Sequence, residues 1–224
     1  MEQIEYLATP DKRSSSLLIL MPPIGDQHDA FEKNGCIDAA RAAHFDADIL
    51  AVDAHQNYFT SMTVRKRLHE DVVMPAKTRG YRSIWMGGIS LGGYGSLLYA
   101  QQYGKTLRGL VLIAPYIGNR GVYAEIESAG GLATWDPEPL LDKDERSIWT
   151  MIQKYHPASK PALPINLMYG KQDRFVDFHR MLESRLNPAC VHAIDGGHEW
   201  AVWRALWDTF VQSHSISTQT DSSP

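Results

Sequence analysis

Five short, almost wholly apolar runs alternate with helical patterns along this chain, and this alternation leaves few folds open. The runs cover residues 16–21, 49–52, 83–86, 110–114 and 165–169, and the helical patterns cover residues 30–43, 62–78, 91–103, 178–186 and 199–210. Strands that are apolar on both faces belong inside a parallel sheet whose two faces are covered by helices. The sequence therefore predicts an α/β fold with a mostly parallel central sheet and helices on both faces.

One long segment interrupts the alternation. Between about residues 117 and 163 there is no clear strand pattern, and glycines, prolines and aromatic residues are frequent. A connection of this length usually is functional or carries its own helices. We therefore expect a small cap with one or two helices within residues 138–155, and an excursion that only covers a sheet edge is the alternative. We expect one domain over residues 1–213 and, because residues 214–224 are mostly small and polar, a disordered tail.

The composition argues against several classes of partner. A formal net charge of −4 implies no broad cationic surface that would bind nucleic acid. No apolar run approaches the roughly 20 residues of a membrane-spanning helix, and the acidic N-terminus lacks a leader pattern. The 2 cysteines do not encode a disulfide framework. We therefore expect a soluble, cytoplasmic protein that acts on a small molecule, and the oligomeric state stays open.

A glycine-rich turn follows the third apolar run. Gly88, Ser90 and Gly92 form the pattern G-x-S-x-G between the strand at 83–86 and a helix that begins near Leu91. In this context the serine adopts a strained backbone and its hydroxyl projects above the sheet, while a side chain at either glycine would collide with its surroundings. A phosphate-binding loop would need a lysine after the second glycine, and a dinucleotide fingerprint would need a glycine at position 90. We therefore interpret Ser90 as a nucleophile.

Two segments carry a resemblance to a known family. Residues 88–95, with the sequence GISLGGYG, resemble the nucleophile elbow of α/β-hydrolases, above all in the esterase D branch of serine carboxylesterases, which includes S-formylglutathione hydrolase and feruloyl and enterochelin esterases. Residues 196–203, GGHEWAVW, are similar to the G-x-H-x-W-x-x-W stretch that carries the catalytic histidine in that branch. The resemblance spans roughly residues 16–210, although only these two motifs are specific. It implies an α/β-hydrolase fold and a hydrolase that acts on esters or related acyl compounds.

A serine nucleophile needs a neighbouring base, and the resemblance implies that this base is a histidine that follows Ser90 and the acid in the chain. His198 is the preferred candidate because it lies on a loop after a final strand at 190–194 and before an amphipathic helix. The other histidines after Ser90 lie in the expected cap, a helix, a strand and the tail: His156, His179, His192 and His214.

The third member should be a carboxylate that orients the imidazole and stabilises its charged form. Asp173 follows the strand at 165–169 and a turn at Gly170, so it is expected at the carboxyl edge of the sheet, where ligands bind. Asp177 is a rival that would instead cap the following helix. Asp195 is nearer to His198 in sequence, but a triad partner normally approaches from a different loop.

Acyl transfer also needs two N–H donors for the oxyanion. One is expected at Leu91, directly after the nucleophile. The second should come from the loop after residues 16–21, where Pro22 and Pro23 have no N–H, so the first available amides are those of Ile24 and then Gly25. Related carboxylesterases and acyl-protein thioesterases have a His-Gly-Leu-Gly-Asp-like stretch here, and this resemblance also puts Ile24 at the donor position.

Further residues are candidates for the substrate site. We expect substrate contacts from residues near the strand ends and in the cap, namely Gly25, His28, Tyr116 and Trp135. Asp26, His55 and Tyr58 are additional candidates for the mouth of the pocket. No H-E-x-x-H motif or paired Cys/His spacing occurs, so we expect no metal and no cofactor. The tryptophans at positions 200, 203 and 207 share one side of a helix and are expected to pack in the core.

These features together predict a serine hydrolase that cleaves a carboxylic ester of a small soluble substrate through an acyl-enzyme on Ser90. A thioesterase or an acyltransferase would use the same three side chains. A non-enzymatic ligand-binding protein built on the same fold is the alternative from another class.

Overall fold

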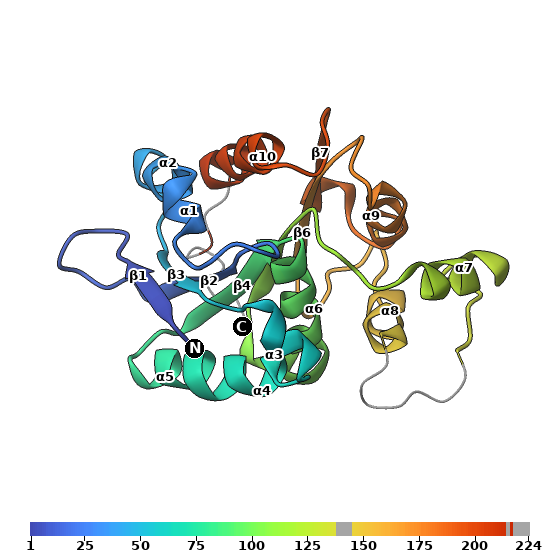
Figure 1. Cartoon of the computed structure of the whole chain (residues 1–224), viewed down its shortest axis with the longest axis horizontal. Helices are drawn as coiled ribbons and strands as arrows, with labels where there is room; N and C mark the ends of the chain where they lie inside the picture. Colours follow the sequence, from blue (N-terminus) through green and yellow to red (C-terminus); the bar gives the residue numbers. More distant parts are fainter. Residues whose placement is uncertain (138–144, 214–215, 217–224) are drawn as a thin grey trace.

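The computed structural model describes residues 1–137, 145–213 and 216, and within them seven strands form one sheet. The strands are β1 (Gln3–Tyr6), β2 (Ser16–Met21), β3 (Asp48–Val52), β4 (Ser83–Ile89), β5 (Gly109–Ile113), β6 (Ile165–Gly170) and β7 (Val191–Ile194). Their order is β1-β3-β2-β4-β5-β6-β7; β1 is antiparallel to β3, and the other neighbours are parallel (Figure 1). The predicted fold class is confirmed.

The sheet separates two apolar cores. Successive side chains of a strand point to opposite faces, and β2 shows this directly: Leu17 and Ile19 belong to one core cluster, whereas Leu18 and Leu20 belong to the other. All four side chains are buried. This two-sided burial is the physical reason why the central strands read as continuous apolar runs in the sequence.

Helices cover both faces of the sheet (Figure 1). The first core is covered by α3 (Gln56–Thr60), α4 (Val64–Arg67), a π-helical segment (Leu68–Val73), α5 (Met74–Thr78), α6 (Leu91–Tyr103), α7 (Arg120–Ser128), α8 (Arg146–Gln153) and α9 (Val176–Glu183). The second core is covered by α1 (Ala30–Lys33), α2 (Cys36–Ala42) and α10 (Trp200–Ser213). Short 3₁₀ turns occupy Gly104–Thr106 and Pro188–Cys190.

Several elements differ from the prediction. The helix expected at 30–43 is two helices, because Gly35 between them adopts a left-handed φ of 71°. The helix expected at 62–78 begins at Val64 and contains the π-helical segment. Strand β1 was not predicted; it is short and alternates polar and apolar residues, as an edge strand does. The helical candidates at 178–186 and 199–210 are shifted, to α9 and α10.

The connection between β5 and β6 contains α7 and α8, as well as residues 138–144, which lie outside the described residues. Helix α8 falls within the predicted helical region of 138–155, whereas α7 lies ahead of it and was not predicted. Of the predicted tail, only residue 216 is described, and Ile216 is buried in the second core. The other residues of the tail lie outside the described residues, so the expectation of a disordered tail stays a prediction.

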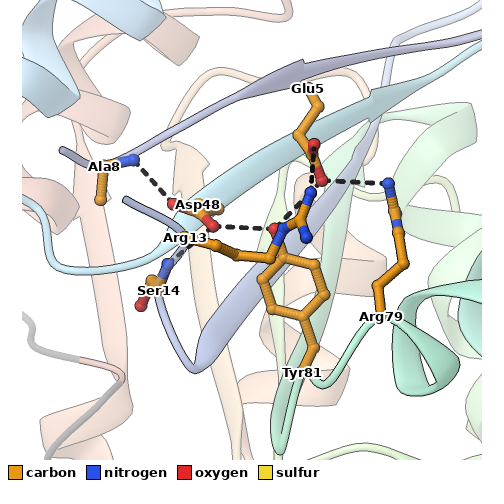
Figure 2. A network of polar contacts seen from close by, with 7 residues as sticks. All are labelled: Glu5, Ala8, Arg13, Ser14, Asp48, Arg79 and Tyr81. Carbon is orange, nitrogen blue, oxygen red and sulfur yellow. Dashed lines mark hydrogen bonds and ion pairs between the residues drawn. The ribbon is translucent and has the colours of Figure 1, made fainter. Parts of the chain in front are cut away.

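A polar network holds β1 at the amino ends of the parallel strands (Figure 2). The buried Asp48, the first residue of β3, accepts hydrogen bonds from the N–H groups of Ala8 and Ser14 and from the hydroxyl of Tyr81. Glu5 of β1 lies within 3.0 Å of the same hydroxyl and forms ion pairs with two arginines. Burial raises the pKa of Tyr81, and the neighbouring carboxylates raise it further, so the hydroxyl stays a donor. The network therefore stabilises the edge remote from the carboxyl ends of the strands.

Candidate functional site

The turn between β4 and α6 holds Ser90 in a conformation that L-residues rarely adopt. Its φ is 52° and its ψ is −110°. Backbone hydrogen bonds hold the turn: the N–H of Ser90 donates to the carbonyl of Ile113 at 3.0 Å, and the carbonyl of Ser90 accepts from the N–H groups of Tyr94 and Tyr116. Strain of this kind persists only where the surroundings fix it, and it concentrates at functional sites. The G-x-S-x-G motif thus forms the strained strand-to-helix turn that its sequence predicts.

The two glycines of the motif are required by close backbone contacts. A Cβ at Gly88 would lie 2.6 Å from the carbonyl oxygen of Met21, and a Cβ at Gly92 would lie 2.1 Å from the same oxygen. The carbonyl belongs to the end of β2, the neighbour of β4 in the sheet. The absence of both side chains therefore lets α6 begin directly above the sheet, as predicted.

Two loops at the carboxyl edge bring Asp173 and His198 together. The loop after β6 contains Asp173, and the loop after the neighbouring β7 contains His198. The N–H of Gln172 donates to the carbonyl of Gly196 at 3.0 Å. A Cβ at Gly170 would lie 2.3 Å from that same carbonyl oxygen, so a glycine is needed for the loops to approach each other.

A chain of hydrogen bonds joins the three predicted residues. The Oγ of Ser90 lies 2.9 Å from Nε2 of His198, and Nδ1 of His198 lies 2.7 Å from Oδ2 of Asp173. An ionised carboxylate accepts only, so Nδ1 carries the proton and Nε2 is free to accept from the serine hydroxyl. The side chain of Asp173 is 0% exposed and that of His198 is 9% exposed. The imidazole is therefore arranged to take a proton from Ser90.

Asp173 is kept ionised despite its burial. Burial raises the pKa of this carboxyl, but hydrogen bonds from His198 and from the N–H of Phe175 lower it, with help from the nearby rings of His179 and His198, and the net pKa lies below its ordinary value. The N–H of Phe175 is 2.8 Å from Oδ1. Both carboxylate oxygens thus have a donor.

Aromatic side chains hold the imidazole on two sides. The rings of Phe175 and Trp203 meet His198 edge-on, with centroid distances of 5.1 Å and 4.9 Å. Such perpendicular contacts are favourable for aromatic rings. Trp203 therefore packs in the core, as predicted, and also fixes the orientation of His198.

The other histidines and carboxylates considered lie away from this chain of hydrogen bonds, except His179. The Asp195 side chain is 82% exposed and pairs with a lysine, and Asp177 lies in the first turn of α9. His192 is exposed on β7, and His156 is exposed after α8. His214 lies outside the described residues.

His179 is buried behind Asp173. Its Nε2 donates to the carbonyl of Pro115 at 2.9 Å, and its side chain is 0% exposed. Burial lowers the pKa of this imidazole to about 4, although Asp173 opposes the shift. His179 is therefore neutral at pH 7 and bridges α9 to the loop after β5.

The backbone N–H groups of Leu91 and Ile24, the predicted oxyanion donors, are not used by the hydrogen bonds of a helix. Leu91 is the first residue of α6, so its N–H is one of those that a helix leaves unsatisfied at its start. Ile24 follows two prolines and is in a turn closed by a hydrogen bond from the N–H of Asp26 to the carbonyl of Pro23. Gly25 supplies the φ of 89° that this turn uses. Within the described residues no partner accepts from the N–H of Ile24.

A pocket of about 420 Å³ lies beside these two residues. Its lining includes Ile24, Gly25 and Leu91 together with residues from the loop after β3. We call it the Ile24 pocket; it is lined by Pro23, Ile24, Gly25, Asp26, Gln27, Asp53, Ala54, His55, Gln56, Asn57 and Leu91. Of the additional candidates for its mouth, Asp26 and His55 are present, and the ring of Tyr58 packs tilted against that of His55, with the centroids 4.3 Å apart.

The remaining predicted substrate residues are in different surroundings. His28 is half-buried next to this loop but does not line the pocket. The backbone N–H of Tyr116 donates a hydrogen bond to the carbonyl of Ser90, and the Tyr116 ring packs against the rings of Tyr94 and Phe175. Trp135 is buried within the β5–β6 connection, and its Nε1 donates to Glu125 of α7. Trp135 thus packs α7 and does not line the Ile24 pocket.

Solved structures of other proteins match the whole architecture. S-formylglutathione hydrolase from Staphylococcus aureus is 15% identical, with a TM-score of 0.59 and coverage of 91% of this chain and 82% of that chain. Est1E from Butyrivibrio proteoclasticus is 18% identical, with a TM-score of 0.66 and coverage of 94% and 90%. Monoacylglycerol lipase from Paleococcus ferrophilus is 14% identical, with a TM-score of 0.61 and coverage of 96% and 99%.

The chain has an α/β-hydrolase fold. At these identities the likeness shows the fold and leaves the chemistry to be argued from the site. No family model matches the sequence, and neither does any curated protein.

Among residues 1–137, 145–213 and 216, no group of three or more His, Cys, Asp or Glu side chains is arranged to hold a metal ion. Over those residues, no helix has the length and apolar character needed to cross a bilayer.

The sequence does not predict that Phe175, His179 and Asp53 belong to this edge of the sheet. Phe175 contacts Asp173 through its backbone N–H and His198 through its ring, and no sequence motif marks either contact. His179 lies in a helix, as predicted, and its position six residues after Asp173 puts it on the helix that directly follows the Asp173 loop.

Proposed function

We propose that this protein is a serine hydrolase that cleaves a carboxylic ester of a small molecule through an acyl-enzyme on Ser90. The observation that carries the proposal is the hydrogen-bonded chain from Ser90 through His198 to Asp173, with distances of 2.9 Å and 2.7 Å. Serine is a weak nucleophile without an adjacent base, and this arrangement supplies the base and the group that orients it.

In the first half of the reaction, Oγ of Ser90 attacks the ester carbonyl while Nε2 of His198 takes the hydroxyl proton. Asp173 stabilises the imidazolium that forms. The carbonyl oxygen becomes an oxyanion, which accepts hydrogen bonds from the N–H groups of Leu91 and Ile24. Collapse of the tetrahedral intermediate breaks the bond to the alcohol oxygen, and His198 delivers its proton to that oxygen.

In the second half, a water molecule replaces the alcohol. Nε2 of His198 takes a proton from this water as its oxygen attacks the acyl carbon. The second tetrahedral intermediate uses the same donors and collapses to release the acid, while His198 returns the proton to Oγ of Ser90. The cycle regenerates the enzyme and needs no cofactor.

The names of two similar structures, a ferulic acid esterase and a monoacylglycerol lipase, support an ester as the substrate. The S-formylglutathione hydrolase is named for a thioester, so that name supports the thioesterase alternative. We also propose that residues 1–213 form a single domain in which the β5–β6 connection acts as its cap. The buried packing of α7 and α8 into the first core supports this.

Activity on p-nitrophenyl acetate, with and without Ser90, tests the proposal. Ser90→Ala is expected to lose at least about a thousandfold in kcat while keeping its circular dichroism spectrum. Ser184→Ala, which changes an exposed serine at the end of α9, is the matched control and should retain activity. His198→Ala should fail as Ser90→Ala does, whereas His192→Ala on the exposed face of β7 should not.

A fluorophosphonate probe gives an independent measurement. It should label the wild-type protein and Ser184→Ala but not Ser90→Ala, as read by intact mass. Wild-type turnover in Ser90→Ala, or labelling at another residue, would refute the mechanism. Products analysed with and without an added alcohol or amine separate hydrolysis from acyl transfer, and acyl thioesters assayed beside the esters separate the two leaving groups.

A further inference from the structure

The loop that contains Ile24 is buried at its start and exposed at its centre. Pro22 and Pro23 are buried, whereas Ile24, whose N–H we assign to the oxyanion, is 51% exposed. A hydrogen bond from the N–H of Asp26 to the carbonyl of Pro23 closes the turn, but it does not attach the turn to another element. Groups of a catalytic site must keep their places to within about 0.5 Å, so this loop needs a second point of attachment.

Asp26 supplies that attachment through its side chain. Its Oδ2 accepts a hydrogen bond from Nε1 of Trp200 at 2.8 Å, a contact between residues 174 apart in the chain. Trp200 is the first residue of α10 and follows His198 by two positions. Because the acceptor is a carboxylate, the hydrogen bond is of the strong, charge-assisted kind. It joins the loop of one predicted oxyanion donor to the segment that carries the base.

The indole of Trp200 is itself held by two other rings. It meets Phe31 of α1 and Trp203 of α10 at interplanar angles of 82° and 71°, with centroid distances of 6.1 Å and 5.4 Å. Phe31 and Trp203 are buried, and Trp203 also meets the imidazole of His198 edge-on. Edge-to-face contacts are a favoured geometry for aromatic rings. Trp203 therefore contacts both the base and the indole to which Asp26 is bound.

The two predicted oxyanion donors differ in what holds them. The N–H of Leu91 belongs to the strained turn after β4, which the backbone hydrogen bonds of Ser90 anchor. The N–H of Ile24 lies between the buried prolines and Asp26, so its position depends on the hydrogen bond to Trp200. Removal of one oxyanion donor typically lowers kcat by about 10²- to 10³-fold. A displaced donor should lose part of that effect.

We propose that Asp26 is a positioning residue for ester cleavage, and that it holds the N–H of Ile24 at the oxyanion through its hydrogen bond to Trp200. The proposal rests on the proposed function, because it takes Ser90 as the nucleophile and Ile24 as a donor. In this role Asp26 touches no reacting atom. Its carboxylate is needed as a hydrogen-bond acceptor, whereas a role in binding substrate would need its charge.

Substitutions at the two ends of this hydrogen bond test the role by kcat/KM on p-nitrophenyl acetate. Asp26→Ala removes the acceptor, and Trp200→Phe removes the donor while it keeps a ring beside Phe31 and Trp203. Each should lower kcat/KM about tenfold. The double variant should lose no more than the more damaging single variant, because both delete one interaction. Asp26→Asn keeps an acceptor oxygen and should stay within about threefold of wild type.

An inhibitor that forms a tetrahedral adduct distinguishes a displaced donor from a weakened fold. The Oγ of Ser90 adds to the carbonyl of trifluoroacetone, its proton passes to His198, and the oxyanion of the adduct needs the same N–H groups as the transition state. The inhibition constant should therefore rise about tenfold in Asp26→Ala and in Trp200→Phe, in parallel with the loss of kcat/KM. The pKa that limits kcat/KM on the acid side should keep its wild-type value, since it reports His198.

Two control variants lie close to this hydrogen bond in the chain. Trp207→Phe removes another indole donor of α10, whose acceptor is the carbonyl of Cys36. Asp29→Ala removes another carboxylate between β2 and α1, which pairs with Lys33 at 2.7 Å. Both should keep the wild-type kcat/KM and the wild-type inhibition constant.

Nuclear magnetic resonance separates the attachment of the loop from the chemistry. The heteronuclear Overhauser effect of the Ile24 and Gly25 amides reports fast motion of the loop. It should fall in Asp26→Ala and Trp200→Phe but not in the two controls. If the wild-type protein hydrolyses no ester but this fall is found, the hydrolase proposal fails and the attachment stands. If neither is found, both fail.

If the wild-type protein does hydrolyse the ester, three results would each overturn the positioning role alone. The first is a wild-type kcat/KM or inhibition constant in Asp26→Ala and Trp200→Phe. The second is an Asp26→Asn variant as poor as Asp26→Ala, which would show that the charge of Asp26 is what matters. The third is an unchanged Overhauser effect at Ile24 and Gly25.

Discussion

At the scale of single residues, the Ser90 turn depends on glycines, because a side chain at these positions would collide with the backbone of β2. Gly92 is the tightest case, since a Cβ there would lie 2.1 Å from the Met21 carbonyl oxygen and 2.8 Å from the Met21 Cβ. The first of these contacts is with backbone inside a buried strand, which cannot move without displacing β2 from its neighbours. The serine therefore owes its position to the missing side chain as much as to its own hydrogen bonds.

Gly92→Ala is expected to destabilise the protein by about 3 kcal/mol or more, because overpacking against rigid backbone is costly. The free energy of unfolding in urea measures this. Gly104→Ala is the matched control: a Cβ there would lie 3.5 Å from a flexible leucine methyl group, an ordinary contact, and should cost little. Equal stability of Gly92→Ala and wild type would mean that α6 does not approach β2 as described.

Residue types and positions were enough to predict that Ser90, Asp173 and His198 lie together. Each follows a predicted strand, and the carboxyl ends of parallel strands meet at one edge, so the three could be placed together before any coordinates were known. The hydrogen bond between Asp26 and Trp200 could not be predicted in this way, because it depends on how α10 packs against the loop after β2.

At the level of elements, α9 is attached to the site through His179. The imidazole donates to the carbonyl of Pro115, and a Cβ at Gly93 of α6 would lie 2.8 Å from the Pro115 side chain, so the same loop also contacts α6. This neutral buried histidine links the acid loop to the nucleophile turn. It must stay neutral to do so, because its charged form would lose most of its solvation.

The stability of the protein should therefore fall in mild acid. The pKa of His179 is lowered to about 4 in the folded protein from 6.5, so the unfolded chain binds more protons between these values. The contribution is fully present above pH 6.5 and is lost as the pH falls toward 4, by up to about 3 kcal/mol.

The variant His179→Gln retains an N–H donor and does not titrate. Urea unfolding at several pH values between 7 and 4 should show a shallower loss of stability in His179→Gln than in wild type. His192→Gln, at an exposed position of β7, should follow the wild-type curve. Parallel curves for wild type and His179→Gln would show that this histidine titrates normally in the folded state.

Elements were predicted where burial determines the pattern. The five apolar runs became strands of the parallel sheet with bounds within a few residues, because burial on both faces leaves few polar positions. Helix bounds were less accurate where a local conformation intervened, such as the left-handed φ of Gly35 that splits α1 from α2. Helix α7 was not predicted because part of its stability comes from contacts with other residues of the connection, which a local pattern does not show. The hydrogen bond from Trp135 to Glu125 is one of these contacts.

Across the whole molecule, distant parts of the chain complete the second core. Helices α1 and α2 near the beginning pack with α10 near the end, and Nε1 of Trp207 donates to the carbonyl of Cys36 at 2.8 Å. Ile216 belongs to the same cluster with only 2% exposure. Residues 214–224 are mostly small and polar, which is why the sequence predicts a disordered tail there, and the burial of Ile216 is not marked by that composition.

Ile216→Ala should lower the free energy of unfolding by about 2 kcal/mol, because it removes buried methyl and methylene groups and leaves a cavity. Met74→Ala is the control, since Met74 is 44% exposed and its truncation should cost no more than about 0.5 kcal/mol. Chemical unfolding of both variants at pH 7 makes the comparison, with hydrolysis of p-nitrophenyl acetate as a check that the site is intact. If Ile216→Ala is as stable as Met74→Ala, the second core closes without residue 216, and the packing of α1, α2 and α10 alone accounts for it.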